Sequence, residues 1–267
     1  MKDLFATLPA PMRRWGKTLA ILGAALATYV GTALLGTLLT GDPIAGAALS
    51  SLVALVMALA YRWGSTGSLR AGRASPRART GQFWLAAAAG LVSCWLLGQT
   101  AAVWLYSAIG SEGFDAVSQT RMDSPVWLVL LTGILLAPIG EEALIRGIAY
   151  PVLRRHWPVM AAAVLSAVVF ALLHGNLVQI ALTVPLGVLL ALVYEHSQRL
   201  WPVIAMHVLF NVASTLTPPA FVSAIANPFM IVGFAAMVVL SMYALARATS
   251  ESAAEQGDQE TAGAGSR

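Results

Sequence analysis

Stretches of about 20 apolar residues recur along almost the whole chain, and this pattern limits what the chain can fold into. A helix needs about 20 such residues to cross the roughly 30 Å hydrocarbon core of a bilayer. Of the 267 residues, 58% are hydrophobic and only 10% are charged, unlike a soluble domain. The sequence therefore predicts an all-α, polytopic bundle of about eight transmembrane helices. We place them at residues 18–39, 44–61, 83–106, 125–150, 159–175, 177–194, 201–216 and 228–246.

The charged residues sort by side of the membrane. If the N-terminus is cytoplasmic, the inner segments hold almost every Lys and Arg, and the outer loops hold only Arg121 beside Glu112, Asp115 and Asp123. This asymmetry follows the positive-inside rule, so we expect an even number of spans and two cytoplasmic termini. The net charge of +4 then reflects topology and contact with membrane lipids, and we expect no nucleic-acid partner. The alanine-rich composition favours a bacterial cell membrane.

Composition also divides the chain into three predicted parts. Residues 1–82 form an N-terminal helix pair and a basic cytoplasmic loop, and residues 83–246 form a membrane-embedded bundle whose polar motifs lie at about 125–215. Residues 247–267 are polar and rich in Gly, Ala, Ser and Glu, so we predict a disordered tail. The lone Cys94 lies within a span and excludes a disulfide framework.

Ionisable side chains inside three predicted helices point to a functional site. Each costs at least about 2.5–3.5 kcal/mol at the bilayer centre, so a cluster of them requires a polar cavity and usually a function. The ionisable residues are Glu141, Glu142 and Arg146 in the fourth helix, His174 at the end of the fifth and His207 in the seventh, and Phe170 and Asn211 lie one turn from the two histidines.

The two adjacent glutamates have different local partners. Glu142 and Arg146 are four residues apart, so they lie on one helix face and can neutralise each other as an ion pair. Glu141 is rotated from Glu142 by about 100° around the helix and finds no partner there. His174 and His207 are its best candidate partners, with the Asn211 amide one turn beyond His207. This hypothesis requires the three helices to bring these groups together.

A carboxylate, two imidazoles and an amide suit hydrolysis by activated water. The carboxylate can accept a proton from water, while imidazole and amide donors stabilise an oxyanion. The same groups can alternatively hold zinc through Glu141, His174 and His207 with a fourth position open. The helical His-Glu-x-x-His zinc signature is absent, and no cofactor is favoured.

Three motifs in this order resemble a known family, the CAAX-processing and bacteriocin-processing (CPBP) intramembrane proteases, also called the Abi/CAAX proteases. The motifs are Glu-Glu-x-x-x-Arg, Phe-x-x-x-His and His-x-x-x-Asn, and the match covers about residues 125–215. The resemblance implies that Glu141 activates water, that His174 orients it, and that His207 and Asn211 stabilise the oxyanion. Glu142, Arg146 and Phe170 match supporting positions.

The resemblance implies an intramembrane endopeptidase acting on a protein or peptide. Its substrate would be prenylated, or would carry a leader or a C-terminal sorting segment. A metal-independent glutamate mechanism is favoured over a zinc mechanism.

Two other functions remain open from the residues alone. Buried Glu and His chains also relay protons in coupled transporters, although no paired, interrupted helices in two similar halves are visible here. A non-catalytic scaffold or immunity protein would use the cluster only to fix helix packing.

Three other residues in or near the predicted spans are not expected to take part in the reaction itself. We expect His156 and His196 to be solvated in short cytoplasmic loops. Pro138 is expected to kink the fourth helix and to open a water path toward Glu141.

Overall fold

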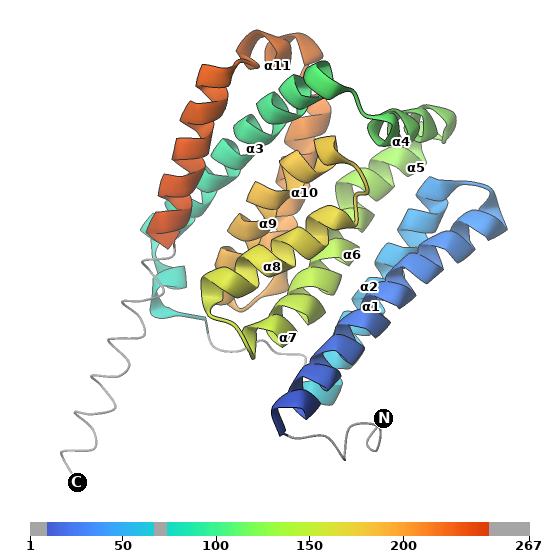
Figure 1. Cartoon of the computed structure of the whole chain (residues 1–267), viewed down its shortest axis with the longest axis vertical. Coiled ribbons are helices and arrows are strands. Elements are labelled where there is room, and N and C mark those ends of the chain that lie inside the picture. The colour runs from blue at the N-terminus through green and yellow to red at the C-terminus, as the bar shows by residue number, and fades with distance from the viewer. Residues whose placement is uncertain (1–9, 67–73, 246–267) are drawn as a thin grey trace. The chain divides into compact units, whose positions relative to one another are not determined.

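The computed structural model describes residues 10–66 and 74–245 (Figure 1). All secondary structure in these two ranges is helical, which confirms the predicted all-α class. The predicted tail at 247–267 lies outside the described residues. The described residues pack as two compact units, each made of two separate segments: residues 10–66 with 115–158, and residues 74–114 with 159–245. The predicted functional boundary near residue 82 stays a prediction.

Every predicted span falls on a helix, but only six of the eight predicted spans have the length of an unbroken crossing. Among the described residues, six helices are long and apolar enough to span a bilayer. The pair Leu200–Leu216 and Pro219–Ile225 would make a seventh, although it is bent by 96°. The predicted span 159–175 is a shorter apolar helix, Val159–Leu172. Its 14 residues are about 21 Å long, less than the hydrocarbon core.

The first unit begins with a tight antiparallel hairpin of two helices. A Cβ added to Gly36 would lie 2.8 Å from the Cα of Gly46, so the two backbones touch there. Gly41 turns the chain with a φ of +73°, and the Asp42 carboxylate then accepts the Ile44 N–H at 2.7 Å and the Ser124 hydroxyl at 2.9 Å. The unit comprises α1 (Ala10–Thr40), α2 (Pro43–Thr66), most of α4 (Glu112–Asp123), and a long span made of α5 (Val126–Leu131), η2 (Thr132–Leu136), α6 (Ala137–Leu144), η3 (Ile145–Ala149) and α7 (Tyr150–Arg154).

The long span contains two π-helical turns, η2 and η3. In them the N–H of Ala137 reaches the Thr132 carbonyl and the N–H of Tyr150 reaches the Ile145 carbonyl, each five residues back. A proline follows each turn, at positions 138 and 151. Proline lacks an N–H and crowds the carbonyl four residues back, and a wider turn relieves this conflict. Pro138 therefore alters the helix, as expected, but the span Val126–Arg154 continues through it. The water path stays a hypothesis.

The second unit packs around α9, the most deeply buried of its helices. Leu189, Leu190 and Leu192 of α9 are fully buried. Small residues let neighbouring helices approach closely, because a Cβ at Gly90 or Gly98 of α3 would meet Leu189 or Leu182 at 2.8 and 2.9 Å. The unit contains η1 (Pro76–Arg79), α3 (Gly81–Ile109), α8 (Val159–Leu172), α9 (Leu177–Ser197), α10 (Leu200–Leu216), α11 (Pro219–Ile225) and the helix Pro228–Leu245.

The expectation of a solvated His196 was wrong. His196 lies in the last turn of α9 and is 2% exposed. Its Nδ1 contacts the Ser75 hydroxyl at 3.0 Å, and its Nε2 donates to the Leu245 carbonyl at 3.1 Å, so the ring ties two chain segments to α9. His156 is also engaged, since it stacks on Trp15 and its Nε2 lies 2.7 Å from the Thr18 hydroxyl.

Candidate active site

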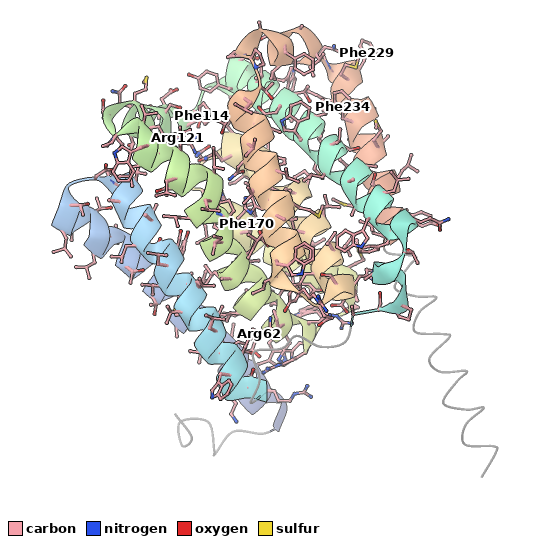
Figure 2. The ribbon with its side chains drawn as sticks, turned by 180° about the vertical axis from the view of Figure 1, so that it is seen from behind. Arg62, Phe114, Arg121, Phe170, Phe229 and Phe234 are labelled. Atoms are coloured by element: carbon pink, nitrogen blue, oxygen red, sulfur yellow. The ribbon has the colours of Figure 1, made fainter. Side chains whose placement is uncertain are left out.

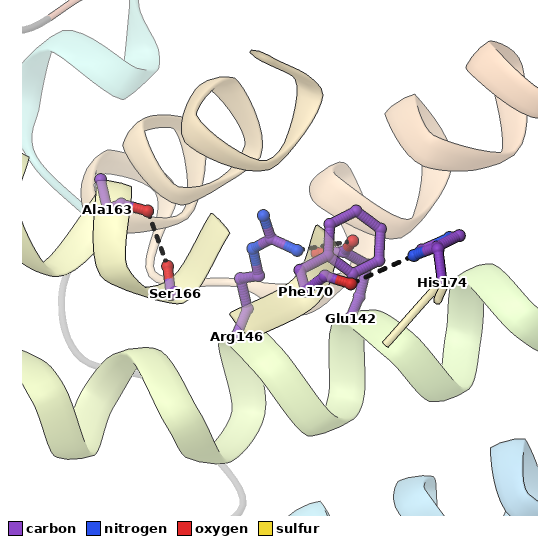
Figure 3. Close-up of polar contacts among 6 residues, drawn as sticks. All are labelled: Glu142, Arg146, Ala163, Ser166, Phe170 and His174. Carbon is purple, nitrogen blue, oxygen red and sulfur yellow. Dashed lines mark hydrogen bonds and ion pairs between the residues drawn. The ribbon is translucent and has the colours of Figure 1, made fainter. Parts of the chain in front are cut away.

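Glu142 and Arg146 form the ion pair that their spacing predicts. Nη1 of Arg146 donates to Oε1 of Glu142 at 2.9 Å, and both side chains are fully buried (Figure 3). Glu142 lies on α6 and Arg146 in the π turn η3, one turn further along the same span. Burying either charge alone inside a membrane span would be costly, so the pair makes this part of the span electrically neutral.

Glu141 lies beside Glu142 on α6 but is only half-buried. Its carboxylate interacts electrostatically with Arg146 of its own span, so the expectation that it has no partner in that helix was wrong. Within the same unit it also interacts with the Tyr29 hydroxyl of α1 and the Arg121 guanidinium of α4. Figure 2 shows Arg121 on α4. Sequence reasoning missed both neighbours. Arg121 carried a signal, as the one basic residue of the predicted outer loops, but Tyr29 carried none.

His174 lies in the turn that follows α8. The N–H of His174 donates to the Ala171 carbonyl at 3.1 Å, and Gly175 leaves the helix with a φ of +70°. Asn176 fixes the other side of the turn, because its amide donates to the His174 carbonyl at 3.1 Å and its Oδ1 caps α9 through the Gln179 N–H. The imidazole is half-buried, as its predicted place near a helix end implied.

A backbone hydrogen bond selects the tautomer of His174. Nδ1 of the ring lies 3.1 Å from the Phe170 carbonyl oxygen (Figure 3). A carbonyl can only accept, so Nδ1 carries the proton. In the neutral ring, Nε2 then presents a lone pair and can accept a hydrogen bond from water.

Phe170 contacts both predicted histidines. Its fully buried ring packs edge-to-face with His174 at 5.0 Å and with His207 at 5.7 Å between centroids. Perpendicular packing is a favourable geometry for aromatic rings. The second unit therefore brings His174 and His207 together around one phenylalanine from α8, and the supporting role of Phe170 stays a prediction.

His207 and Asn211 lie one turn apart on α10. His207 is 3% exposed and Asn211 is half-buried. The α9–α10 turn sets this register, because Gln198 adopts a left-handed conformation with a φ of +53° and α10 begins at Leu200.

The predicted site residues thus form two groups, one in each unit. The glutamates and Arg146 belong to the first unit, and Phe170, His174, His207 and Asn211 belong to the second. Each group is organised internally, and their convergence into one site stays a prediction. Among the described residues, no three His, Cys, Asp or Glu side chains are grouped in a way that could hold a metal ion.

The fold and these polar motifs define an integral, multi-pass membrane protein whose chemistry-bearing residues lie in or beside its membrane helices. Residues 123–213 match the family model of the Rce1-like type II CAAX prenyl endopeptidases. All three motifs lie inside the matched segment, so the resemblance predicted from them is confirmed.

One relative is a Bacillus subtilis (strain 168) protein named "Putative membrane peptidase YdiL". The two sequences are 26% identical over 103 residues, which cover 39% of this chain and 42% of the relative. The match thus spans less than half the length of that relative. No solved structure matches the chain significantly.

Proposed function

We propose that this protein is an intramembrane endopeptidase that hydrolyses a peptide bond of a membrane-associated protein or peptide. The match of residues 123–213 to CAAX prenyl endopeptidases, with all three polar motifs inside it, is the observation that carries this proposal. The organised pair of imidazoles around Phe170 supports it further.

In the proposed reaction, Glu141 takes a proton from water while the water oxygen attacks the scissile carbonyl carbon. The Nε2 lone pair of His174 accepts the other hydrogen of that water and so orients it. His207 and Asn211 donate to the oxyanion of the tetrahedral intermediate. When the C–N bond breaks, Glu141 returns its proton to the leaving amine. Glu142 and Arg146 support the span and take no part in the proton transfers.

Zinc remains the alternative to this glutamate mechanism. It would take Glu141, His174 and His207 as ligands and would polarise the carbonyl and activate water. His174 has one ring nitrogen committed to Phe170, so only its Nε2 could bind the ion. We derive no step through a metal and favour the metal-independent route. Metal analysis of the purified protein, with activity measured after chelation, separates the two.

The proposed substrate class follows from the family that residues 123–213 match. A prenylated peptide with a C-terminal CAAX-type sequence is the first candidate, because the matched family is described as prenyl endopeptidases. Leader peptides and C-terminal sorting segments are the other candidates. In each case we expect a substrate already held at the membrane.

The test is the Glu141→Gln variant. The protein would be purified in lipid nanodiscs and assayed with internally quenched peptides, one farnesylated at a CAAX-type terminus and one resembling a leader peptide. Because a general base contributes about 10²–10⁴-fold, we expect kcat to fall by at least about 10²-fold while the protein stays folded.

Glu112→Gln on the exposed α4 is the matched control and should retain activity. Full activity in Glu141→Gln would refute the assignment. A substrate-dependent pH change in sealed vesicles without peptide cleavage would instead favour a proton-coupled transporter. Activity in cells that survives both Glu141→Gln and His174→Ala, at unchanged expression, would favour a scaffold.

A further inference from the structure

The N-terminal hairpin of α1 and α2 lies outside the segment that matches the endopeptidase family, yet it packs on the helix that carries the proposed general base. Gly140, the residue before Glu141, faces Ser51 of α2. A Cβ added at Gly140 would lie 2.3 Å from the Cα and 2.5 Å from the Cβ of Ser51. No side chain can separate these two helices here, so Ser51 is held at the level of Glu141.

Ser51 belongs to a group of three hydroxyls. The Ser50 and Ser51 hydroxyls both donate to the Ala47 carbonyl, at 2.9 and 2.8 Å, so their hydrogens are committed to the α2 backbone. Both serine side chains interact with the Tyr29 hydroxyl of α1. Both serines are only 1% exposed. The Tyr29 hydroxyl thus lies beside two buried serine side chains, Ser50 and Ser51, within the hairpin.

The Tyr29 hydroxyl also interacts electrostatically with Glu141. A water between the hydroxyl and the carboxylate could hydrogen-bond to both groups and link them within the span. The close contact at Gly140 keeps Ser51, and with it the tyrosine that interacts with Ser51, next to the helix turn that carries Glu141.

We propose that Tyr29 is a positioning residue. Its hydroxyl, which interacts with Ser50 and Ser51, holds the Glu141 carboxylate in place through a bridging water. The N-terminal hairpin then contributes to the site and is more than a membrane anchor. The kinetic part of this inference rests on the proposed peptidase function, whereas the contact itself does not.

The experiment compares Tyr29→Phe with Tyr61→Phe in the full-length protein in nanodiscs. Tyr61 is the matched control, because it lies on the same hairpin and its hydroxyl accepts from Arg155 at 2.9 Å instead. The readout that does not depend on activity is the infrared carboxyl band of Glu141, identified by its loss in Glu141→Gln. We expect Tyr29→Phe to shift this band and Tyr61→Phe to leave it in place.

In the peptidase assay, Tyr29→Phe should lower kcat by about threefold to tenfold, the effect of one hydrogen bond, with KM unchanged. Ser51→Ala keeps the Cβ that faces Gly140 and removes only the hydroxyl, so it should shift the band in the same direction. It also serves as the second variant if Tyr29→Phe does not fold.

An unmoved Glu141 band in a folded Tyr29→Phe or Ser51→Ala protein would overturn the inference, as would an equal shift in Tyr61→Phe. A shifted band in a protein that cleaves no peptide would refute the proposed function while supporting the Tyr29 contact. The two failures are therefore distinguishable.

Discussion

Glu141 and Glu142 are neighbours in the chain, but they face different surroundings. Glu142 is fully buried and bonded to Arg146, whereas the half-buried Glu141 interacts electrostatically with Arg146, Tyr29 and Arg121. Glu142 already has an ionic partner, Arg146, inside the same span. This difference is consistent with the proposed supporting role of Glu142 and the proposed role of Glu141 as the base.

Removing one member of the buried pair should cost more than removing both. Glu142→Gln or Arg146→Gln leaves one buried charge without its ionic partner, and we expect each to lower the free energy of unfolding by about 3–5 kcal/mol. The double variant Glu142→Leu/Arg146→Met keeps the volume and buries no charge, so it should stay within about 1–2 kcal/mol of the wild type. Unfolding in mixed micelles measures all three. A double variant as unstable as the single ones would contradict the neutralisation argument.

At this scale, sequence reasoning succeeded where the interaction is local. A spacing of four residues within one helix fixes the Glu142–Arg146 pair and the Phe170–His174 contact before any tertiary packing. It failed at His196, whose two ring partners lie 121 and 49 residues away in the chain. Tyr29 was missed for the same reason, because nothing local marks its contact with Glu141.

At the scale of elements, the long span of the first unit depends on one close contact. The backbone of α2 reaches Gly140 so closely that a side chain there would overlap with backbone atoms of Ser51. Gly133 lies in the same span with open space around its Cα.

Gly140→Ala should therefore displace α6 from α2 and lower both stability and proposed activity. We expect a destabilisation of about 1–3 kcal/mol, typical of overpacking a tight contact. Gly133→Ala is the matched control and should be close to neutral or slightly stabilising, because alanine favours helix. Thermal unfolding in nanodiscs measures both. If the two variants behave alike, the close contact does not limit this position.

The apolar pattern predicted the positions of the helices more accurately than the number of helices that cross the membrane. The pattern marks an apolar segment, but Leu172 ends α8 after 14 residues, and the chain bends by 96° between α10, which ends at Leu216, and α11. The two π turns were also not predicted, although Pro138 marked the place of one. Backbone geometry of this kind depends on neighbouring helices, which hydropathy does not report.

At the scale of the whole molecule, the predicted topology limits the number of crossings. Two cytoplasmic termini require an even number, so the six long helices cross alone, or the bent pair α10–α11 and the short α8 both cross with them. Seven crossings would put the termini on opposite sides.

We expect reporters fused to either terminus to be cytoplasmic and a reporter inserted at Gly110–Ser111 to be external. The inserted reporter lies beside the acidic segment that the positive-inside rule places outside. Paired fluorescent-protein and alkaline-phosphatase fusions measure both, and tagged Cys94→Ser protein with single new cysteines is an independent control. Termini on opposite sides would show that the charge asymmetry was misinterpreted.

Each packing unit is assembled from segments that are not consecutive in the chain, and this affects synthesis. Gly90 and Gly98 of α3 pack on α9, which begins at Leu177, roughly 70 residues after α3 ends. At translation rates of about 5–20 residues per second, α3 enters the bilayer several seconds before its main partner exists. During that interval the first unit is completed by the span Val126–Arg154. The quality-control machinery that acts during synthesis therefore encounters a partly assembled protein. In it, the surface of α3 that later packs on α9 is still uncovered.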